Sequence, residues 1–445
     1  MYLVGYDVAG VHRYVFEPVR PVDVLGGSRL LERFAVEAAK VAARQGATVI
    51  YSAGGTGLFQ VDGEKAAASL ATKLTQTLQH LTADGARCTA AWVESSRDFR
   101  AGRRRLAAEL RAERFRVALG SAPRVLLPRG TWPSGVCEAC GREVRTASRR
   151  VGDRGEGIGP RCRARYQAAG GPVPTIAEIL GGEGDDVPRG AVLAAVYVDA
   201  DELGRRLAEV ASPDDLRRFS ERLTGFVRDA VGGARTALSP RPILEVAVGG
   251  DDALLFCDAA QVPELTGSVW ERLAGASSDL GVRFSTGIVL GEPFLPLRLY
   301  FGAAEEALRA AKGRSHATGR SHVGIGALIA GPRGAAQDVL GGPVPQEAFL
   351  GSGGVWALVG RVRAIVPAQR AGLGDDLALP SREEAKLAVE HRALRDKGVA
   401  HALSGTRSLA AAHGLDHLAL LRGVLALAGT GGAARERATG EVEQA

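Results

Sequence analysis

The strongest hydrophobic pattern in the chain is the run AVLAAVYVDA over 191–200, which is apolar almost throughout and ends in an acid. An uninterrupted run of this length is typical of a strand that is buried on both faces. Two amphipathic patterns follow, ELGRRLAEV and DLRRFSERLTGFVRDAV, and the second opens after Ser212 and Pro213, residues that commonly begin a helix. The pattern therefore predicts a strand followed by two helices.

Two more strand-like runs, ILEVAV at 243–248 and ALLFC at 253–257, flank a Gly-Gly-Asp-Asp turn. Strands joined by a short glycine-containing turn form a β-hairpin. The next elements are a helix at 261–280, a strand at 282–290, a helix at 298–312 and the short strand HVGIGAL. The resulting order, βααββαβ, predicts an antiparallel-type sheet with helices on one face.

The beginning of the chain repeats this plan in shorter form. We predict a strand at YLVGYDV, a helix at RLLERFAVEAAKVAARQG and a hairpin formed by ATVIYSA and LFQVD. A helix at 64–80 and the strand ARCTAAWVE follow. Asp7 takes the place of Asp199, but the turn after Gly54-Gly55 has no aspartates. Self-similarity of this kind indicates tandem domains, one of which lacks the acidic residues.

These patterns predict an α+β fold in five parts. The boundaries we expect are 1–120 for the first copy, 121–180 for a Cys-containing insert and linker, 190–330 for the second copy, 331–430 for a C-terminal helical region with helices at 383–400 and 408–428, and 431–445 for a flexible tail of low hydrophobicity.

Composition narrows the class of protein. With 445 residues, 46% hydrophobic and 24% charged, the chain can bury several cores and is neither disordered nor fibrous. No apolar run reaches the roughly 18 residues of a membrane helix, and the first residues do not resemble a signal peptide. We therefore expect no membrane partner and a cytoplasmic location with reduced cysteines. The net charge of +6 weakly favours polyanionic partners such as nucleotides or RNA.

The acids of the second copy are candidates for chemistry. Asp199 ends a buried strand and Asp201 follows at i+2, where a purely structural strand rarely carries acids. If that strand and the hairpin share a sheet, Asp199 meets Asp251 and Asp252 at one edge, and three carboxylates suit two Mg²⁺ or Mn²⁺ ions. The alternative is that Gly-Gly-Asp-Asp is an ordinary solvated turn.

Lys312 is the candidate cation for a triphosphate. It stands beside Gly313 at the predicted end of the 298–312 helix, among several arginines. The alternative is a cation that stabilises the C-terminal end of the helix dipole.

Taken together, these residues carry a resemblance. Asp199-Ala200-Asp201, Gly249-Gly250-Asp251-Asp252, Phe284-Ser285-Thr286-Gly287 and Ala310-Ala311-Lys312 resemble the Palm domain of the polymerase/cyclase large subunit of type III CRISPR effector complexes, and more distantly GGDEF cyclases. The segments 10–16 and 25–28 resemble the degenerate first Palm of that subunit. The resemblance implies two tandem ferredoxin-like Palm domains. No histidine is followed by Asp, so we expect no HD nuclease here.

The resemblance also implies a function in antiviral defence: ATP is converted into cyclic or linear 3′–5′ oligoadenylate and pyrophosphate is released. Asp199, Asp251 and Asp252 are then the catalytic metal ligands. The residues implied to bind nucleotide are Ala200, Asp201, Gly249, Gly250, Ser285 and Lys312. The implied partners are nucleoside triphosphates, subunits of an RNA-guided complex, and target RNA as activator.

Two other functions fit the same sequence. The first is a catalytically silent Palm pair that binds guide RNA or partner proteins, because the first copy retains the fold without the hairpin acids. The second is a GGDEF-like synthase of a cyclic dinucleotide, which differs only in its base pocket.

Cysteines in the insert suggest a second metal. Cys137 and Cys140 resemble the first half of the family's zinc ribbon, but the second half offers only Cys162. Structural zinc needs four ligands. Asp153 or Cys88 could complete the set, and the alternative is a ribbon that has lost its metal.

Overall fold

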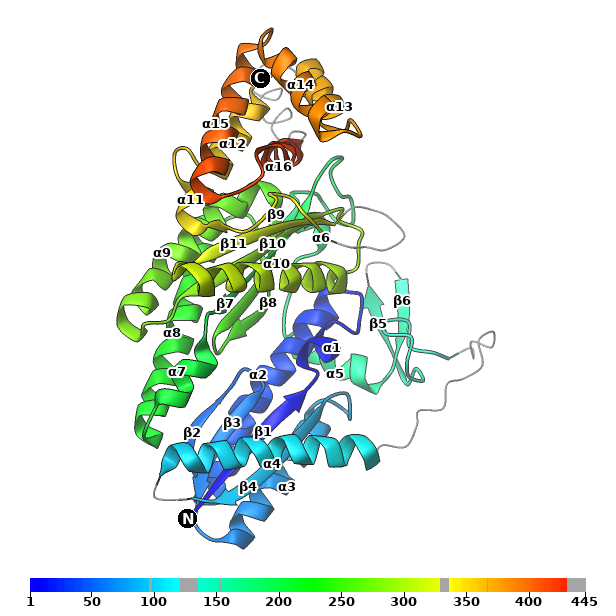
Figure 1. Cartoon of the computed structure of the whole chain (residues 1–445). Helices are drawn as coiled ribbons and strands as arrows, with labels where there is room; N and C mark the ends of the chain where they lie inside the picture. The colour runs from blue at the N-terminus through cyan, green and yellow to red at the C-terminus, as the bar shows by residue number, and fades with distance from the viewer. Residues whose placement is uncertain (96–97, 121–134, 152–153, 329–335, 366, 430–445) are drawn as a thin grey trace. The chain divides into compact units, whose positions relative to one another are not determined.

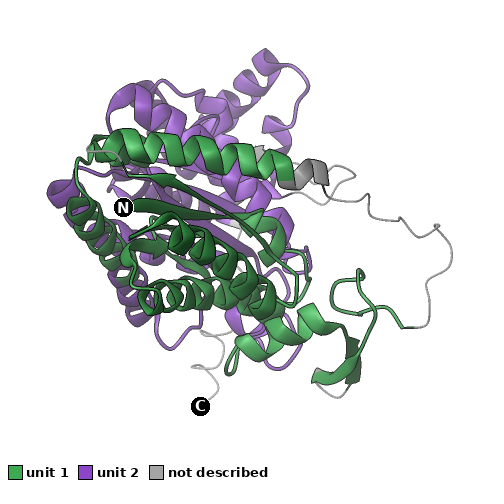
Figure 2. Cartoon of the chain, turned by 90° about the horizontal axis from the view of Figure 1, so that it is seen from below, with its two compact units in different colours: residues 1–173, 203–228, 246–252 green, residues 174–202, 229–245, 253–445 purple. Residues whose placement is uncertain are grey.

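The computed structural model describes residues 1–445 except 96–97, 121–134, 152–153, 329–335, 366 and 430–445 (Figure 1). The chain forms two compact units (Figure 2). Unit 1 comprises residues 1–173, 203–228 and 246–252, and unit 2 comprises residues 174–202, 229–245 and 253–445.

Unit 1 is built on a four-stranded sheet in the order β2-β3-β1-β4. The central strand β1 runs antiparallel to both β3 and β4. The bounds are β1 (Tyr2–Ala9), β2 (Thr48–Ala53), β3 (Thr56–Val61) and β4 (Arg87–Glu94), with helices α1 (Val11–Val15), α2 (Pro21–Arg44), α3 (Glu64–Leu81) and α4 (Phe99–Gly120).

Helices cover both faces of this sheet. Tyr6 of β1 packs edge-on against Phe34 of α2, whereas a Cβ at the adjacent Gly5 would meet Leu106 of α4 at 3.0 Å. Because successive strand residues point to opposite faces, α2 and α4 lie on opposite sides. The prediction of helices on one face concerned the repeated elements, and α4, which follows the last strand of this repeat, covers the second face.

The insert contacts α2 in two ways: a close backbone approach at a glycine, and a buried ion pair. Its elements are β5 (Ala147–Val151), β6 (Arg154–Ile158) and α5 (Pro160–Ala168). A Cβ at Gly26 of α2 would lie 1.9 Å from the Arg165 carbonyl oxygen, so glycine is needed for this approach. The buried Arg149 guanidinium of β5 donates to Asp23 of α2 and to Glu156 of β6.

The second sheet has the strand order β12-β11-β10-β7-β9-β8, with β13 also paired to β11. Its strands are β7 (Leu193–Ala200), β8 (Leu244–Gly249), β9 (Asp252–Asp258), β10 (Phe284–Gly291), β11 (His322–Leu328), β12 (Ala336–Asp338) and β13 (Val344–Pro345). Helix α6 (Ile176–Ile179) precedes these strands, and the helices between them are α7 (Leu203–Glu209), α8 (Pro213–Leu238), the 3₁₀ turn η1 (Ala259–Gln261), α9 (Val262–Leu280) and α10 (Leu297–Thr318).

One pair in this sheet departs from the prediction of an antiparallel-type sheet. β10 is antiparallel to β7 but parallel to β11, because α10 crosses over between them. The helix lies close to both strands: a Cβ at Gly287 of β10 would be 2.2 Å from the Ala304 carbonyl oxygen, and one at Gly324 of β11 would be 2.4 Å from that of Ala307. These glycines allow α10 to pack closely on β10 and β11.

The C-terminal part is helical, as predicted, but more finely divided. Asp396 caps a new helix by accepting from the Val399 N–H, which splits the predicted 383–400 helix, and the left-handed Gly414 ends the next one. The helices are α11 (Gln346–Leu350), α12 (Val355–Arg363), α13 (Pro367–Leu377), α14 (Arg382–Ala393), α15 (Lys397–His413) and α16 (His417–Gly429). Among the described residues, no helix is long and apolar enough to cross a membrane.

Candidate active site

The end of β7 carries a contact between a carboxylate and the candidate phosphate cation. Lys312 Nζ donates to Asp199 Oδ2 at 2.6 Å and to the Ala200 carbonyl oxygen at 2.8 Å. Both side chains are partly exposed, so the pair lies where a ligand can reach it. The structure thus brings together three of the predicted site residues, from β7 and from α10.

Lys312 lies within its helix, not at the end. The prediction stopped the helix at 312, but α10 continues to Thr318 and is capped by the left-handed Gly319. Gly313 is tolerated because Ser315 and His316 in the following turn contact the carboxylates of Asp201 and Glu202 just after β7. The helix-dipole interpretation of Lys312 loses its basis, since that effect is confined to the last turn.

Asp201 is enclosed by the fold and is only 5% exposed. Its Oδ2 accepts from Ser285 Oγ of β10 at 2.9 Å and from Ser315 Oγ of α10 at 2.6 Å, and its N–H donates to the Arg283 carbonyl oxygen. Its Oδ1 is buried without a hydrogen-bond partner among the described residues. Burial raises the pKa of Asp201, although the serine hydrogen bonds oppose the shift. Asp201 therefore connects β7, β10 and α10.

Glu202 forms a third connection, which was not among the residues predicted from the sequence. Its backbone is left-handed at φ 54°, and its carboxylate contacts His316 Nδ1 at 2.7 Å and Arg283 Nη2 at 3.4 Å. The signal was present as a matching spacing: acids at 199, 201 and 202 face α10 residues at 312, 315 and 316. Neighbours three and four apart lie on one helix face.

The Gly-Gly-Asp-Asp segment forms the tip of the β8–β9 hairpin. Gly249 ends β8, Asp252 begins β9, and Gly250 has φ 70°, a conformation that favours glycine. Asp251 and Asp252 are half-buried. These four residues belong to unit 1, whereas Asp199 and Lys312 belong to unit 2, and their grouping with Asp199 stays a prediction.

The first copy shows how such a hairpin sits beside its strand. Asp7 of β1 is in register with Thr56, the first residue after the Gly54-Gly55 turn. Arg114 of α4 forms an ion pair with Asp7. In both copies, the acid near the strand end is therefore paired with a cation from a helix packed on the sheet.

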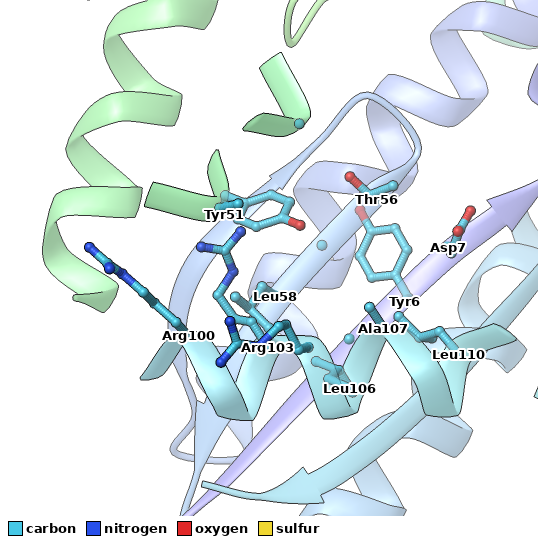
Figure 3. Close-up of a pocket in the computed structure, with 15 residues that line it drawn as sticks. Tyr6, Asp7, Tyr51, Thr56, Leu58, Arg100, Arg103, Leu106, Ala107 and Leu110 are labelled. Carbon is cyan, nitrogen blue, oxygen red and sulfur yellow. The ribbon is translucent and has the colours of Figure 1, made fainter. Parts of the chain in front are cut away.

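A cavity of about 340 Å³ in unit 1 lies over this part of the first sheet (Figure 3). Asp7 and Thr56 line one end, and Tyr51, Arg100 and Arg103 line the other. Both arginines donate to backbone carbonyls of α7, Arg100 to Glu209 and Arg103 to Leu207. They therefore anchor α7 over the sheet as well as lining the cavity.

A second group of potential ligands lies in the insert. Four potential ligand atoms lie within 4.8 Å of one another, one from each of Cys137, Cys140, Glu143 and Cys162. A hydrogen bond from Cys162 lowers the pKa of Cys140 to about 6, and the same contact, together with burial, raises the pKa of Cys162. This donor set fits a tetrahedral zinc ion.

Neither fourth ligand suggested by the sequence is in this group. Cys88 lies on β4 and donates to the Thr89 carbonyl oxygen, and Asp153 lies outside the described residues. Zinc ribbons are recognised by cysteine spacing, so Glu143, three residues after Cys140, gave no signal in the sequence.

The segment that carries these residues matches a known domain family. Residues 192–321 match the family described as Cas10/Cmr2, second palm domain. The resemblance read from the sequence is confirmed. The matched segment contains the end of β7, the hairpin tip and Lys312. Comparison with functionally curated proteins finds no match.

Solved structures show the same fold over nearly the whole chain. A chain of the Csm1–Csm4 cassette in complex with pppApApA has 15% identity and a TM-score of 0.60, covering 96% of this chain and 69% of that chain. The cassette in complex with cA4 gives 16% identity and 0.60 over the same shares. The apo cassette gives 16% and 0.56, covering 96% and 70%. The α+β class with palm-domain sheets and a C-terminal helical part is therefore confirmed.

Proposed function

We propose that this chain is a metal-dependent nucleotidyltransferase that joins ATP into cyclic or linear 3′–5′ oligoadenylate and releases pyrophosphate. It would act as the large subunit of a type III CRISPR-like effector complex. The observation that carries the proposal is the contact of Lys312 with both Asp199 and the Ala200 carbonyl, within a segment that matches the second palm domain.

The oxygens around Lys312 fit a hard divalent cation. Asp199 Oδ2 and the Ala200 carbonyl oxygen already converge on one positive centre, the Lys312 ammonium. Oxygen ligands of this kind are those that Mg²⁺ and Mn²⁺ prefer. When bound, the metal ions lower the pKa of an attacking 3′-hydroxyl and stabilise the leaving pyrophosphate. Lys312 is then free to exchange its carboxylate partner for a phosphate oxygen of the triphosphate.

The first copy supports placing the hairpin acids beside Asp199. The strand orders β2-β3-β1-β4 and β8-β9-β7-β10 are equivalent. In the first copy, the register puts the strand acid Asp7 next to the hairpin turn. By the same plan, Asp251 and Asp252 lie near Asp199 and complete the metal site.

The structural relatives support a proposal for substrate and partners. Solved Csm1–Csm4 cassettes are in complex with one ATP, with pppApA and with cA4. For this chain we propose ATP as substrate, oligoadenylate as product, and a Csm4-like subunit and target RNA as partner and activator.

The test is to incubate the chain with Mg²⁺ or Mn²⁺ and each labelled nucleoside triphosphate, with and without an assembled guide complex and target RNA. Mass spectrometry then identifies the products. Oligoadenylate from ATP alone among the triphosphates supports the proposal, whereas a dinucleotide from GTP favours a GGDEF-like synthase.

A silent Palm pair is the second candidate, because the first copy keeps its fold without hairpin acids. Stable association with guide RNA and no turnover under any activator would support it.

A further inference from the structure

The end of the insert departs from a four-cysteine ribbon. Where a second Cys-x-x-Cys is expected, the chain has Cys162-Arg163-Ala164-Arg165, so an arginine stands at the position of the fourth cysteine. We propose that Glu143 replaces this cysteine as the fourth ligand of a zinc ion and that Arg165 stabilises the resulting negative charge.

Glu143 is held facing the cysteines. Its Oε1 lies 3.9 Å from Cys140 Sγ and accepts from the Cys162 N–H at 3.2 Å, and its Oε2 accepts from the Arg161 N–H at 3.3 Å. A Cβ at Gly159 would lie 2.3 Å from Glu143 Cγ, so glycine makes room for this side chain. The Glu143 side chain is 13% exposed, against 50% for Glu138 of the same loop.

The loop that carries the first three donors is ordered by its own backbone. The Cys137 N–H donates to the Glu143 carbonyl oxygen at 2.7 Å, and the Gly141 N–H donates to the Cys137 carbonyl oxygen at 2.8 Å. Cys137 and Cys162 are buried. Zinc bound at about 2.3 Å from sulfur and about 2.0–2.2 Å from oxygen separates its ligand atoms by about 3.5–3.8 Å. The donor set therefore needs only a small contraction to become tetrahedral.

Arg165 supplies the compensating charge. Three thiolates and a carboxylate leave a zinc site with net negative charge, which is costly to bury without a cation. Arg165 is fully buried and its Nη1 lies 3.7 Å from Cys162 Sγ, while its Nη2 donates to Glu17 Oε2 and to the Tyr14 carbonyl oxygen. Outer partners of this kind orient ligands and tune metal affinity.

Capping and ligation by Glu143 make different predictions. A carboxylate at the start of α5 can simply accept the Arg161 and Cys162 N–H groups. Glu143→Gln keeps an acceptor for these bonds but is a poor zinc ligand. Glu143→Cys removes the cap and restores four thiolates. Glu138→Gln changes an exposed glutamate of the same loop and serves as the control.

The experiment measures zinc content and the absorption spectrum of Co²⁺ substituted into the purified full chain. We expect about one zinc per chain in the wild type and in E138Q, a tetrahedral Co²⁺ spectrum, at least tenfold weaker metal binding in E143Q, and stronger thiolate-to-cobalt charge transfer in E143C. A folded E143Q chain with wild-type zinc affinity would make Glu143 a cap only. A wild-type chain that binds neither zinc nor tetrahedral Co²⁺ would overturn the proposal entirely.

Discussion

Lys312 donates a 2.6 Å hydrogen bond to Asp199, so the residue assigned to the triphosphate contacts the residue assigned to the metal. The pair neutralises a positive and a negative charge at the edge of the second sheet. Under the proposed function, both charges would change partners when a metal-bound nucleotide enters, and this exchange would link phosphate binding to metal binding.

Replacing Lys312 with methionine should remove most of the activity and little of the stability. A partly exposed ion pair contributes only about 0.2–1 kcal/mol to folding. Loss of one charge that stabilises a transition state costs about 10²–10³-fold in kcat. Kinetics of pyrophosphate release and a thermal melt give both values. The exposed Lys386→Met variant should behave as wild type in both, and wild-type turnover in K312M would remove Lys312 from the site.

Asp201 should make stability depend on pH in the opposite sense from a salt-bridged acid. Burial raises the pKa of Asp201 above its unfolded value near 3.9. The folded chain therefore binds this proton more tightly, and the associated stability is present at low pH and lost as pH rises through the raised pKa. Urea unfolding of the wild type and of Asp201→Asn from pH 4 to pH 7 measures this change in the free energy of unfolding.

The stability difference between wild type and D201N should shift in favour of D201N as pH rises across that range. A difference that stays constant would show that Asp201 titrates alike in the folded and unfolded chain.

The Asp23–Arg149 contact should hold the insert to the first copy. Both side chains are buried, and Arg149 Nη2 donates to Asp23 Oδ2 at 2.6 Å. Asp23→Asn leaves Arg149 with only Glu156 as a carboxylate partner, and breaking a buried pair costs about 3–5 kcal/mol. In this variant, limited proteolysis should show early cleavage in the insert, and chemical unfolding should show a lowered unfolding midpoint. The Glu37→Gln change on the same helix removes only a partly exposed i,i+3 ion pair with Lys40 and should change the unfolding midpoint little. An equal effect of both variants would argue against the special role of Asp23.

Gly287→Ala should displace α10 and with it the Lys312–Asp199 contact of the candidate active site. The added Cβ would lie 2.2 Å from the Ala304 carbonyl oxygen and 2.6 Å from the Leu308 backbone nitrogen, so α10 must move. Overpacking of this kind costs about 1–3 kcal/mol or more, and displacement of α10 carries Lys312 away from Asp199. Gly302→Ala, on the same helix with open space, should be neutral or slightly stabilising. Wild-type stability and activity in G287A would contradict the close packing.

The strands and the acid at the end of β7 could be predicted from the sequence because burial on both faces leaves an uninterrupted apolar run. The extent of α10 could not, because Gly313 indicates a helix end and the contacts that continue the helix, from Ser315 and His316 to Asp201 and Glu202, are made far along the chain. Local propensity was overruled by tertiary contacts.

The start of α2 and the fourth donor of the insert were hidden for a similar reason. Gly26 and Gly27 resemble a loop, but Gly26 lies in a helix because α5 approaches it closely. Glu143 belongs to the cysteine group only after the loop folds back onto α5. Such residues are recognised by what surrounds them, which spacing alone does not reveal.

The most direct test of the proposed function compares pyrophosphate release and product masses from ATP and Mg²⁺ for the wild type and for the Asp251→Asn/Asp252→Asn double variant. The comparison uses the activated complex. Asp62→Asn, an exposed change on another loop, is the control. We expect oligoadenylate from wild type and D62N and none from the double variant, with all three chains equally folded. Undiminished product from the double variant would show that the hairpin acids are not the catalytic site.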